Sequence, residues 1–157
     1  MLKALFLDMD ETLCDTPGAN EQAKLLMAQA LQVQLGDTFD GQGFSEAYVT
    51  GIYREWSAVQ HARYMPIIEQ QSEEVFRVQL IRDLLAERGI NNLSNETAQA
   101  LQDKFDKDRI DAFDFYPGIK EWLAEARKIF TLIVITNGPE FSQIPKVDPR
   151  RPPELRT

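Results

Sequence analysis

Two short apolar runs stand near opposite ends of the chain, with amphipathic segments between them. Residues 2–8 are mainly apolar up to Asp8, and residues 130–135 form a β-branched run that Thr136 and Asn137 follow. Short apolar runs bounded by polar residues are typical of buried strands. Each run therefore predicts a strand with polar side chains at its carboxyl end.

The segments between the two runs have helical periodicity. Apolar residues recur at three- and four-residue spacing in residues 20–35, 45–64, 72–88, about 94–113, and 119–128. Asn20 and Ser72 are suitable N-caps, and Gly36 and Gly89 follow the first and third segments. We expect the second segment to end before Pro66, because proline disrupts a helix interior.

The order of the elements predicts an α/β protein with a parallel sheet, because parallel strands need a long crossover connection. Residues 1–15 and 114–140 are expected to form an incomplete sheet core, and residues 16–113 an inserted α-helical cap. Four prolines interrupt residues 141–157, for which we expect an irregular tail rich in Pro and Arg.

Composition narrows the range of partners. The formal net charge of −8 disfavours nonspecific binding to nucleic acid or to an anionic membrane. The single cysteine, Cys14, excludes an intrachain disulfide and fits a reducing compartment. Neither a membrane-spanning run nor a signal peptide is evident in the sequence, so a cytoplasmic location is expected.

The acid pair Asp8 and Asp10 is the most informative chemical feature. Carboxylates at the end of a buried strand are costly unless a cation or a reaction uses them. Asp8 is placed to bind Mg²⁺ and to act as a nucleophile that forms an aspartyl-phosphate. Asp10 is placed for general acid and base catalysis. If the two strands pair, Thr136 and the backbone around Asn137 lie at the same edge and bind phosphate.

These residues resemble the haloacid dehalogenase superfamily. Its first motif is an apolar strand followed by Asp-x-Asp-x-Thr, as in residues 8–12, and its second is an apolar strand that ends in Thr or Ser, as at Thr136. The helical insertion between the motifs is similar to the small cap of that family. The resemblance covers residues 1 to about 140 and implies a Rossmann-like core.

The resemblance implies a Mg²⁺-dependent phosphatase that acts on a small phosphorylated metabolite, such as a sugar phosphate or a nucleotide. Asp8 would be the nucleophile and a metal ligand. Asp10 would be the acid and base, with its backbone carbonyl on Mg²⁺. Thr136 would bind phosphate. Asp10 favours phosphate esters over carbon–halogen chemistry, and a phosphomutase or haloacid dehalogenase is the alternative on the same scaffold.

Two further motifs of the family are not evident: a lysine that pairs with the nucleophile and phosphate, and a later acidic pair. Lys146 is the one lysine after the second motif, and no helical pattern surrounds it. We therefore expect a C-terminally truncated phosphatase with weak or no activity. The alternative is a non-catalytic module that associates through an unpaired sheet edge, with a homo-oligomer as one outcome.

Overall fold

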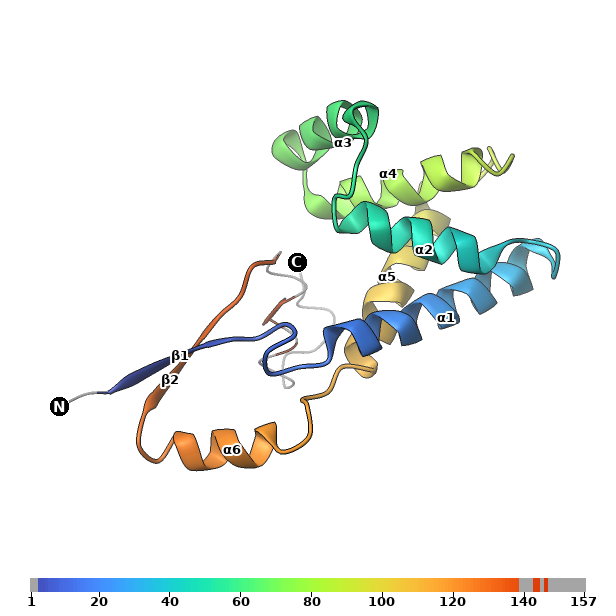
Figure 1. Ribbon diagram of the computed structural model, residues 1–157. Coiled ribbons are helices and arrows are strands. Elements are labelled where there is room, and N and C mark those ends of the chain that lie inside the picture. The colour runs from blue at the N-terminus through green and yellow to red at the C-terminus, as the bar shows by residue number, and fades with distance from the viewer. Residues whose placement is uncertain (1–2, 139–142, 145, 147–157) are drawn as a thin grey trace. The chain divides into compact units, whose positions relative to one another are not determined.

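The computed structural model describes residues 3–138, 143, 144 and 146 (Figure 1). Within this part the chain is mostly helical, with six helices and a two-stranded parallel sheet. In chain order the elements are β1 (Ala4–Asp8), α1 (Thr16–Leu35), α2 (Gly41–Ile52), α3 (Ala58–Gln70), α4 (Glu73–Ala86), α5 (Asn95–Asp111), α6 (Ile119–Ala126) and β2 (Thr131–Ile135). No helix among these is long and apolar enough to cross a membrane.

The chain divides into two compact units. One comprises residues 1–21 and 109–157, and the other comprises residues 22–108. The sequence pattern placed the corresponding boundaries at residues 15/16 and 113/114. The first unit holds both strands and α6, and the second holds most of the helical insertion.

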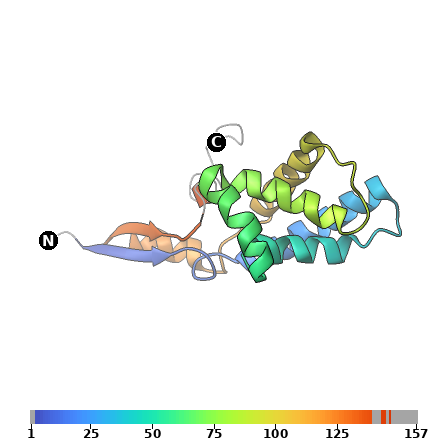
Figure 2. The same ribbon diagram turned by 90° about the horizontal axis from the view of Figure 1, so that it is seen from above.

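The predicted parallel pairing of the two strands is confirmed. β1 pairs with β2 in a register that runs from Ala4 opposite Thr131 to Asp8 opposite Ile135. Helix α6 lies along one face of this sheet (Figures 1 and 2). That face is closed by a small apolar cluster formed by Leu5, Leu7, Met9, Leu13, Cys14, Phe113, Phe115, Ile119, Leu123 and Leu132.

The second face of the sheet is uncovered within the described residues. Side chains alternate between the two faces of a strand, so Phe6, Ile133 and Ile135 point away from the α6 cluster. Their exposed fractions are 61%, 37% and 53%. Parallel sheets normally bury both faces, so this face is unusual for its sheet type.

The helical unit has its own apolar core. Helix α4 packs against both α2 and α3, and edge-on aromatic contacts join Tyr48 to Phe105 and Trp56 to Phe76. Its fifteen buried core residues are Ala23, Met27, Leu31, Phe44, Tyr48, Ile52, Tyr64, Phe76, Leu80, Ile81, Leu84, Leu85, Ala98, Leu101 and Phe105. The core is continuous because each helix contributes one apolar stripe.

The predicted single helix over residues 45–64 is wrong, because two helices occupy this region. The chain leaves α2 at Arg54, whose φ of 61° is incompatible with a right-handed helix. Ser57 then starts α3 with a capping box to Gln60. Pro66 lies inside α3, so the expectation that a helix ends before it is also wrong.

Helix α1 begins at Thr16, four residues before the expected N-cap Asn20. The turn residues Pro17 and Gly18 belong to its first turn, where the missing N–H of proline costs little. The carboxylate of Asp15 accepts a hydrogen bond from the Gly18 N–H at 2.9 Å. This contact stabilises the helix start by filling one of its unpaired donors.

Candidate functional site

The carboxyl ends of β1 and β2 bring together two sequence motifs that lie far apart in the chain. Asp8 is the last residue of β1 and stands opposite Ile135, the last residue of β2. Thr136 follows β2 directly, and its Oγ1 lies 3.4 Å from Oδ2 of Asp10. The parallel register therefore places Asp8, Asp10 and Thr136 at one edge of the sheet.

Asp8 is exposed and lightly held. Its Oδ2 accepts a hydrogen bond of 2.8 Å from the Thr12 hydroxyl, four residues later. This contact orients the carboxylate but leaves its other oxygen open to solvent or to a ligand. Thr12, the last residue of the first motif, therefore positions the carboxylate of Asp8.

Asp10 is partly buried and accepts hydrogen bonds from four side chains. The Oδ1 atom accepts from Thr16 Oγ1 at 2.7 Å and from Lys146 Nζ at 2.5 Å. The Oδ2 atom accepts from Gln143 Nε2 at 3.2 Å and from Thr136 Oγ1 at 3.4 Å. The chain's own donors thus fill the environment of this carboxylate.

These contacts change the acidity of Asp10. Partial burial by itself would raise the pKa of its carboxyl group, because desolvation disfavours the charged form. The hydrogen bonds from Lys146, Thr16 and Gln143, together with the charge of Lys146, outweigh burial and lower the pKa below its ordinary value. Asp10 is therefore an ionised acceptor at neutral pH.

The loop after β1 is shaped by one carbonyl group. The Met9 carbonyl accepts from the backbone N–H groups of Thr12, Leu13 and Cys14, at 3.4, 2.9 and 3.2 Å. To close this turn Glu11 adopts a left-handed conformation with φ of 59°, which is uncommon for a residue with a side chain. The tight loop keeps Asp8 and Asp10 on the same edge.

Lys146 is the functional candidate that the sequence pattern did not reveal. We expected no helix to place it, yet Gln143, Ile144 and Lys146 have helical backbone. Its side chain is 2% exposed, and its Nζ lies 5.4 Å from the ring centroid of Phe113. Those three residues depart from the expected irregular tail over 141–157, and the rest of that tail lies outside the described residues.

Asn137, the other predicted phosphate-binding residue, is not drawn into this cluster. It is exposed at the carboxyl end of β2. Thr136 is brought to Asp10, whereas the Asn137 side chain makes no hydrogen bond to another described residue. A role for Asn137 through its backbone therefore remains a prediction.

Cys14 lies beside the acid pair without joining its chemistry. It is fully buried in the cluster under α6. Burial, with a smaller contribution from the Asp10 charge, raises the pKa of its thiol to about 11. The group is a neutral thiol at physiological pH, so it is a small core residue and not a nucleophile.

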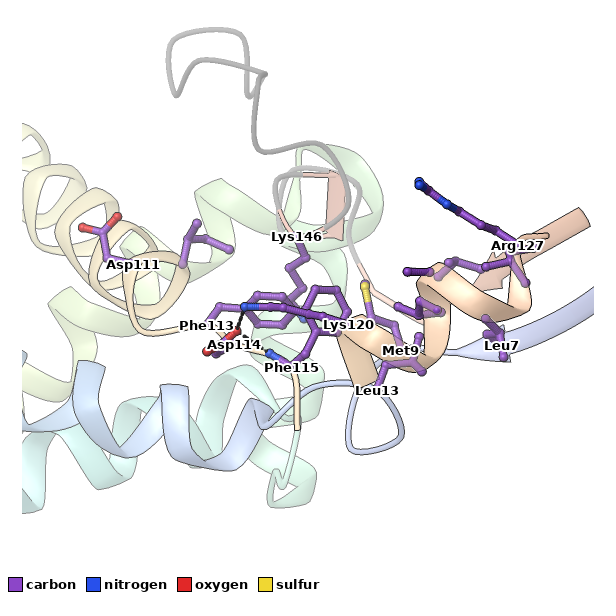
Figure 3. A pocket seen from close by; sticks show the side chains of 15 residues that line it. Leu7, Met9, Leu13, Asp111, Phe113, Asp114, Phe115, Lys120, Arg127 and Lys146 are labelled. Carbon is purple, nitrogen blue, oxygen red and sulfur yellow. Dashed lines mark hydrogen bonds and ion pairs between the residues drawn. The ribbon is translucent and has the colours of Figure 1, made fainter. Parts of the chain in front are cut away.

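A cavity of about 800 Å³ lies between α6 and the sheet. Figure 3 shows that side chains from the loop after β1, the segment before α6, and α6 itself line it. Its lining is mainly apolar, with Lys120, Arg127, Asp111, Asp114 and Lys146 among the charged members. Asp8 and Asp10 are not among the residues that line this cavity, although Lys146, which donates a hydrogen bond to Asp10, is one of them.

The oxygen atoms of Asp8 and Asp10 are of the chemical type that Mg²⁺ prefers as ligands. Mg²⁺ is held in proteins by one or two carboxylates, with water and substrate phosphate completing its shell. Asp8 offers an exposed carboxylate, whereas the side-chain oxygens of Asp10 are already occupied. Among the described residues no three His, Cys, Asp or Glu side chains gather to form a fuller protein cage.

Comparisons with models of known protein families and with curated protein sequences give no match to this chain.

Proposed function

We propose that this chain is a phosphomonoester hydrolase of the haloacid dehalogenase type, with a Rossmann-like core and a helical cap. The observation that carries the proposal is the meeting of the two motifs at one edge of the parallel sheet. Asp8 ends β1 with an open carboxylate, and Thr136, which follows β2, reaches Asp10. Ligands of open α/β sheets bind at this edge.

The proposed reaction has two steps. A carboxylate oxygen of Asp8 attacks phosphorus, the bond from phosphorus to the ester oxygen breaks as that oxygen takes a proton from solvent water, and an aspartyl-phosphate forms. A second water then attacks phosphorus, Asp10 exchanges one of its side-chain hydrogen bonds for this water and accepts its proton, and the bond from phosphorus to Asp8 breaks as inorganic phosphate leaves. Thr12 holds Asp8 in position for both steps, through its 2.8 Å hydrogen bond.

Mg²⁺, held by the Asp8 carboxylate and by the Asp10 backbone carbonyl, would neutralise phosphate charge at this edge. Thr136 would donate its hydroxyl to a phosphate oxygen. The proposed substrate is a small phosphorylated metabolite.

The test is magnesium-dependent release of phosphate from p-nitrophenyl phosphate. Asp8→Asn keeps the size of the side chain but removes the nucleophilic carboxylate, so turnover should fall by at least about 100-fold. Asp37→Asn is the matched control, because Asp37 is exposed in the other unit. Mass spectrometry of acid-quenched native protein should find one phosphoryl group on the peptide that contains Asp8.

Equal turnover in native protein and Asp8→Asn would contradict the proposal, as would a phosphoryl group on any other residue. Turnover that survives removal of all divalent cations would contradict the part assigned to Mg²⁺.

The uncovered sheet face favours a second candidate function, a module that associates through its sheet. Phe6 and Ile135 are more than half exposed on that face. Each strand also pairs with only one neighbour among the described residues, so free backbone donors and acceptors line both edges. A second copy of this chain is the partner proposed for this function.

A further inference from the structure

The cavity between α6 and the sheet has preformed walls. Every residue that lines it belongs to the unit of residues 1–21 and 109–157, so one compact unit builds it. The segment before α6 is fixed to the loop after β1 by backbone hydrogen bonds. The Asp15 N–H donates to the Asp114 carbonyl at 3.1 Å, and the Tyr116 N–H donates to a carbonyl of that loop at 3.0 Å. The cavity volume of about 800 Å³ lies within the range of small-molecule sites, roughly 300–1,000 Å³.

One stripe of α6 runs along this cavity. Lys120, Leu123, Ala124 and Arg127 all line it, and their spacing of three, four and seven residues places them on one side of a helix. Arg127 continues the helical backbone as the C-cap of α6. At 1.5 Å per residue, Lys120 and Arg127 stand about 10 Å apart along the axis. The stripe is therefore apolar in its middle and cationic at each end.

The cations of the lining differ in what they can offer a ligand. The Lys120 ammonium pairs with Asp114 at 2.5 Å, and the Lys146 ammonium pairs with Asp10 at 2.5 Å. Arg127 is exposed, and its side chain makes no ion pair or hydrogen bond with another residue that the structure describes. Its guanidinium is therefore the cation of the lining that is available to a ligand.

The acids of the lining lie away from that cation. Figure 3 shows Arg127 at one end of the lining and Asp111 and Asp114 toward the other. Between the ends the surface is apolar, and part of it is open to water. Val134 lines the cavity and is 42% exposed, although it lies on the sheet face that α6 covers. Covering such apolar surface is favourable, so the cavity suits a ligand with one anionic end and an apolar body.

We propose that this cavity binds an amphipathic anion, a medium-chain carboxylate with an unbranched apolar tail, at a site separate from the acid pair. The carboxylate pairs with the Arg127 guanidinium, whose planar donors match its two oxygens. The tail lies along Leu123 and Ala124, and the stripe length of about 10 Å suits the extended chain of octanoate. The carbonyl groups at the end of α6 weakly disfavour an anion, and bidentate pairing with Arg127 outweighs them.

The first experiment is isothermal titration calorimetry of the full native chain with hexanoate, octanoate and octylammonium. Octanoate should bind about 15-fold more tightly than hexanoate, because each buried methylene contributes about fourfold. Octylammonium has the same tail and the opposite charge, so it should bind at least about 10-fold more weakly than octanoate. Equal binding of octanoate and octylammonium overturns the anionic class, and no binding of octanoate overturns the site.

Arg127→Met tests the head-group contact, because it removes the cation and keeps an unbranched side chain. The affinity for octanoate should fall at least about 10-fold, whereas the affinity for octylammonium should not fall. Lys128→Met is the matched control, because Lys128 is the next residue, is 63% exposed and pairs with Glu125. An unchanged affinity for octanoate in Arg127→Met overturns the proposal, as does an equal loss in Lys128→Met.

Ala124→Phe tests the location of the tail, because a phenyl ring at this position fills the cavity without changing a charge. Octanoate binding should be lost while far-UV circular dichroism keeps its native shape. Phe6→Ser is the control, because Phe6 lies on the opposite face of the sheet and is 61% exposed. Native affinity in Ala124→Phe, or lost binding in Phe6→Ser, places the ligand elsewhere and overturns the proposal. Arg127 is exposed, so its variant remains a test if Ala124→Phe does not fold.

Discussion

Single residues that link helices show how this chain uses paired charges. Asp83 on α4 accepts hydrogen bonds from Arg63 at 2.5 and 2.7 Å, from Tyr64 at 3.0 Å and from Gln79 at 2.8 Å. Burial alone would raise the pKa of Asp83, but the bonds from Arg63, Gln79 and Tyr64 outweigh it and lower the pKa. The ionised form is therefore favoured by the fold.

This shift predicts a pH-dependent stability. A carboxylate with a lowered pKa in the folded state contributes stability above its unfolded pKa, about 3.9, and loses it as the pH falls further. Asp83→Asn should lower the free energy of unfolding by about 2 kcal/mol at pH 7. The difference from native protein should shrink below about pH 3.

Urea unfolding followed by far-UV circular dichroism at both pH values measures this difference. Asp37→Asn, at an exposed position of the same unit, should change the free energy by less than about 0.5 kcal/mol. If Asp83→Asn lowers the free energy of unfolding equally at both pH values, the charge of Asp83 is not the source of its stabilising effect.

The residues at the sheet edge differ in whether the sequence reveals them. Asp8 and Asp10 could be identified because two carboxylates directly after an apolar run need a chemical reason. Lys146 could not, because its importance arises from a contact with a residue 136 positions earlier in the chain. Thr16 likewise lies outside the helix predicted over residues 20–35, although it begins α1 and donates a hydrogen bond to Asp10.

At the scale of elements, helix packing depends on close backbone contacts. Gly41 is the first residue of α2 and lies against the backbone of α1. A Cβ atom on Gly41 would lie 2.6 Å from the Ala28 carbonyl oxygen. That neighbour belongs to the backbone of a helix, so it cannot move aside as a flexible side chain would. The approach of α1 and α2 therefore requires glycine at this position.

Gly41→Ala should destabilise the helical unit by about 1–3 kcal/mol, the usual cost of overpacking. The measurement is the urea midpoint of the full chain, followed by far-UV circular dichroism. Gln29→Ala provides the matched control, because Gln29 is adjacent to Ala28 but exposed on α1; it should change stability by less than about 0.5 kcal/mol. Equal effects of the two substitutions would refute a packing role for Gly41.

The division of residues 45–64 into two helices belongs to the same scale. The apolar periodicity is present on both sides of Arg54, so periodicity alone predicts one continuous helix in place of α2 and α3. The break depends on a single left-handed residue and on the capping box at Ser57. Helix α3 continues past Pro66, and Tyr64 on the same helix is buried. Tertiary packing here outweighs the low helix propensity of proline.

At the scale of the whole molecule, the sheet is the least complete part. A two-stranded sheet is marginal in water unless a further layer covers it. Helix α6 supplies one layer, and Phe6, Ile133 and Ile135 are left exposed on the other face. An apolar face of this kind favours association with a second copy.

Sedimentation velocity over a range of protein concentrations tests this association. The native chain should form dimers as the concentration rises. Phe6→Ser should shift the transition to higher concentration, because Phe6, at 61%, is more exposed than the other two large apolar residues of the face, Ile133 and Ile135. Val33→Ser is the control, since Val33 is 90% exposed on α1 but does not belong to the sheet. A native chain that stays monomeric at every concentration would exclude this interface.

The sequence by itself determined the features that depend on local pattern. The two strands, the existence of the amphipathic helices, and the acid pair followed by a threonine all show in neighbouring residues, because hydrophobic periodicity and carboxylate spacing are local properties. The tertiary structure alone decided which distant groups meet. The contacts of Asp10 with Thr136, Gln143 and Lys146 join residues more than 120 positions apart in the chain. They are decided by the tertiary structure, because the local pattern of apolar and polar residues around each group does not indicate its distant partner.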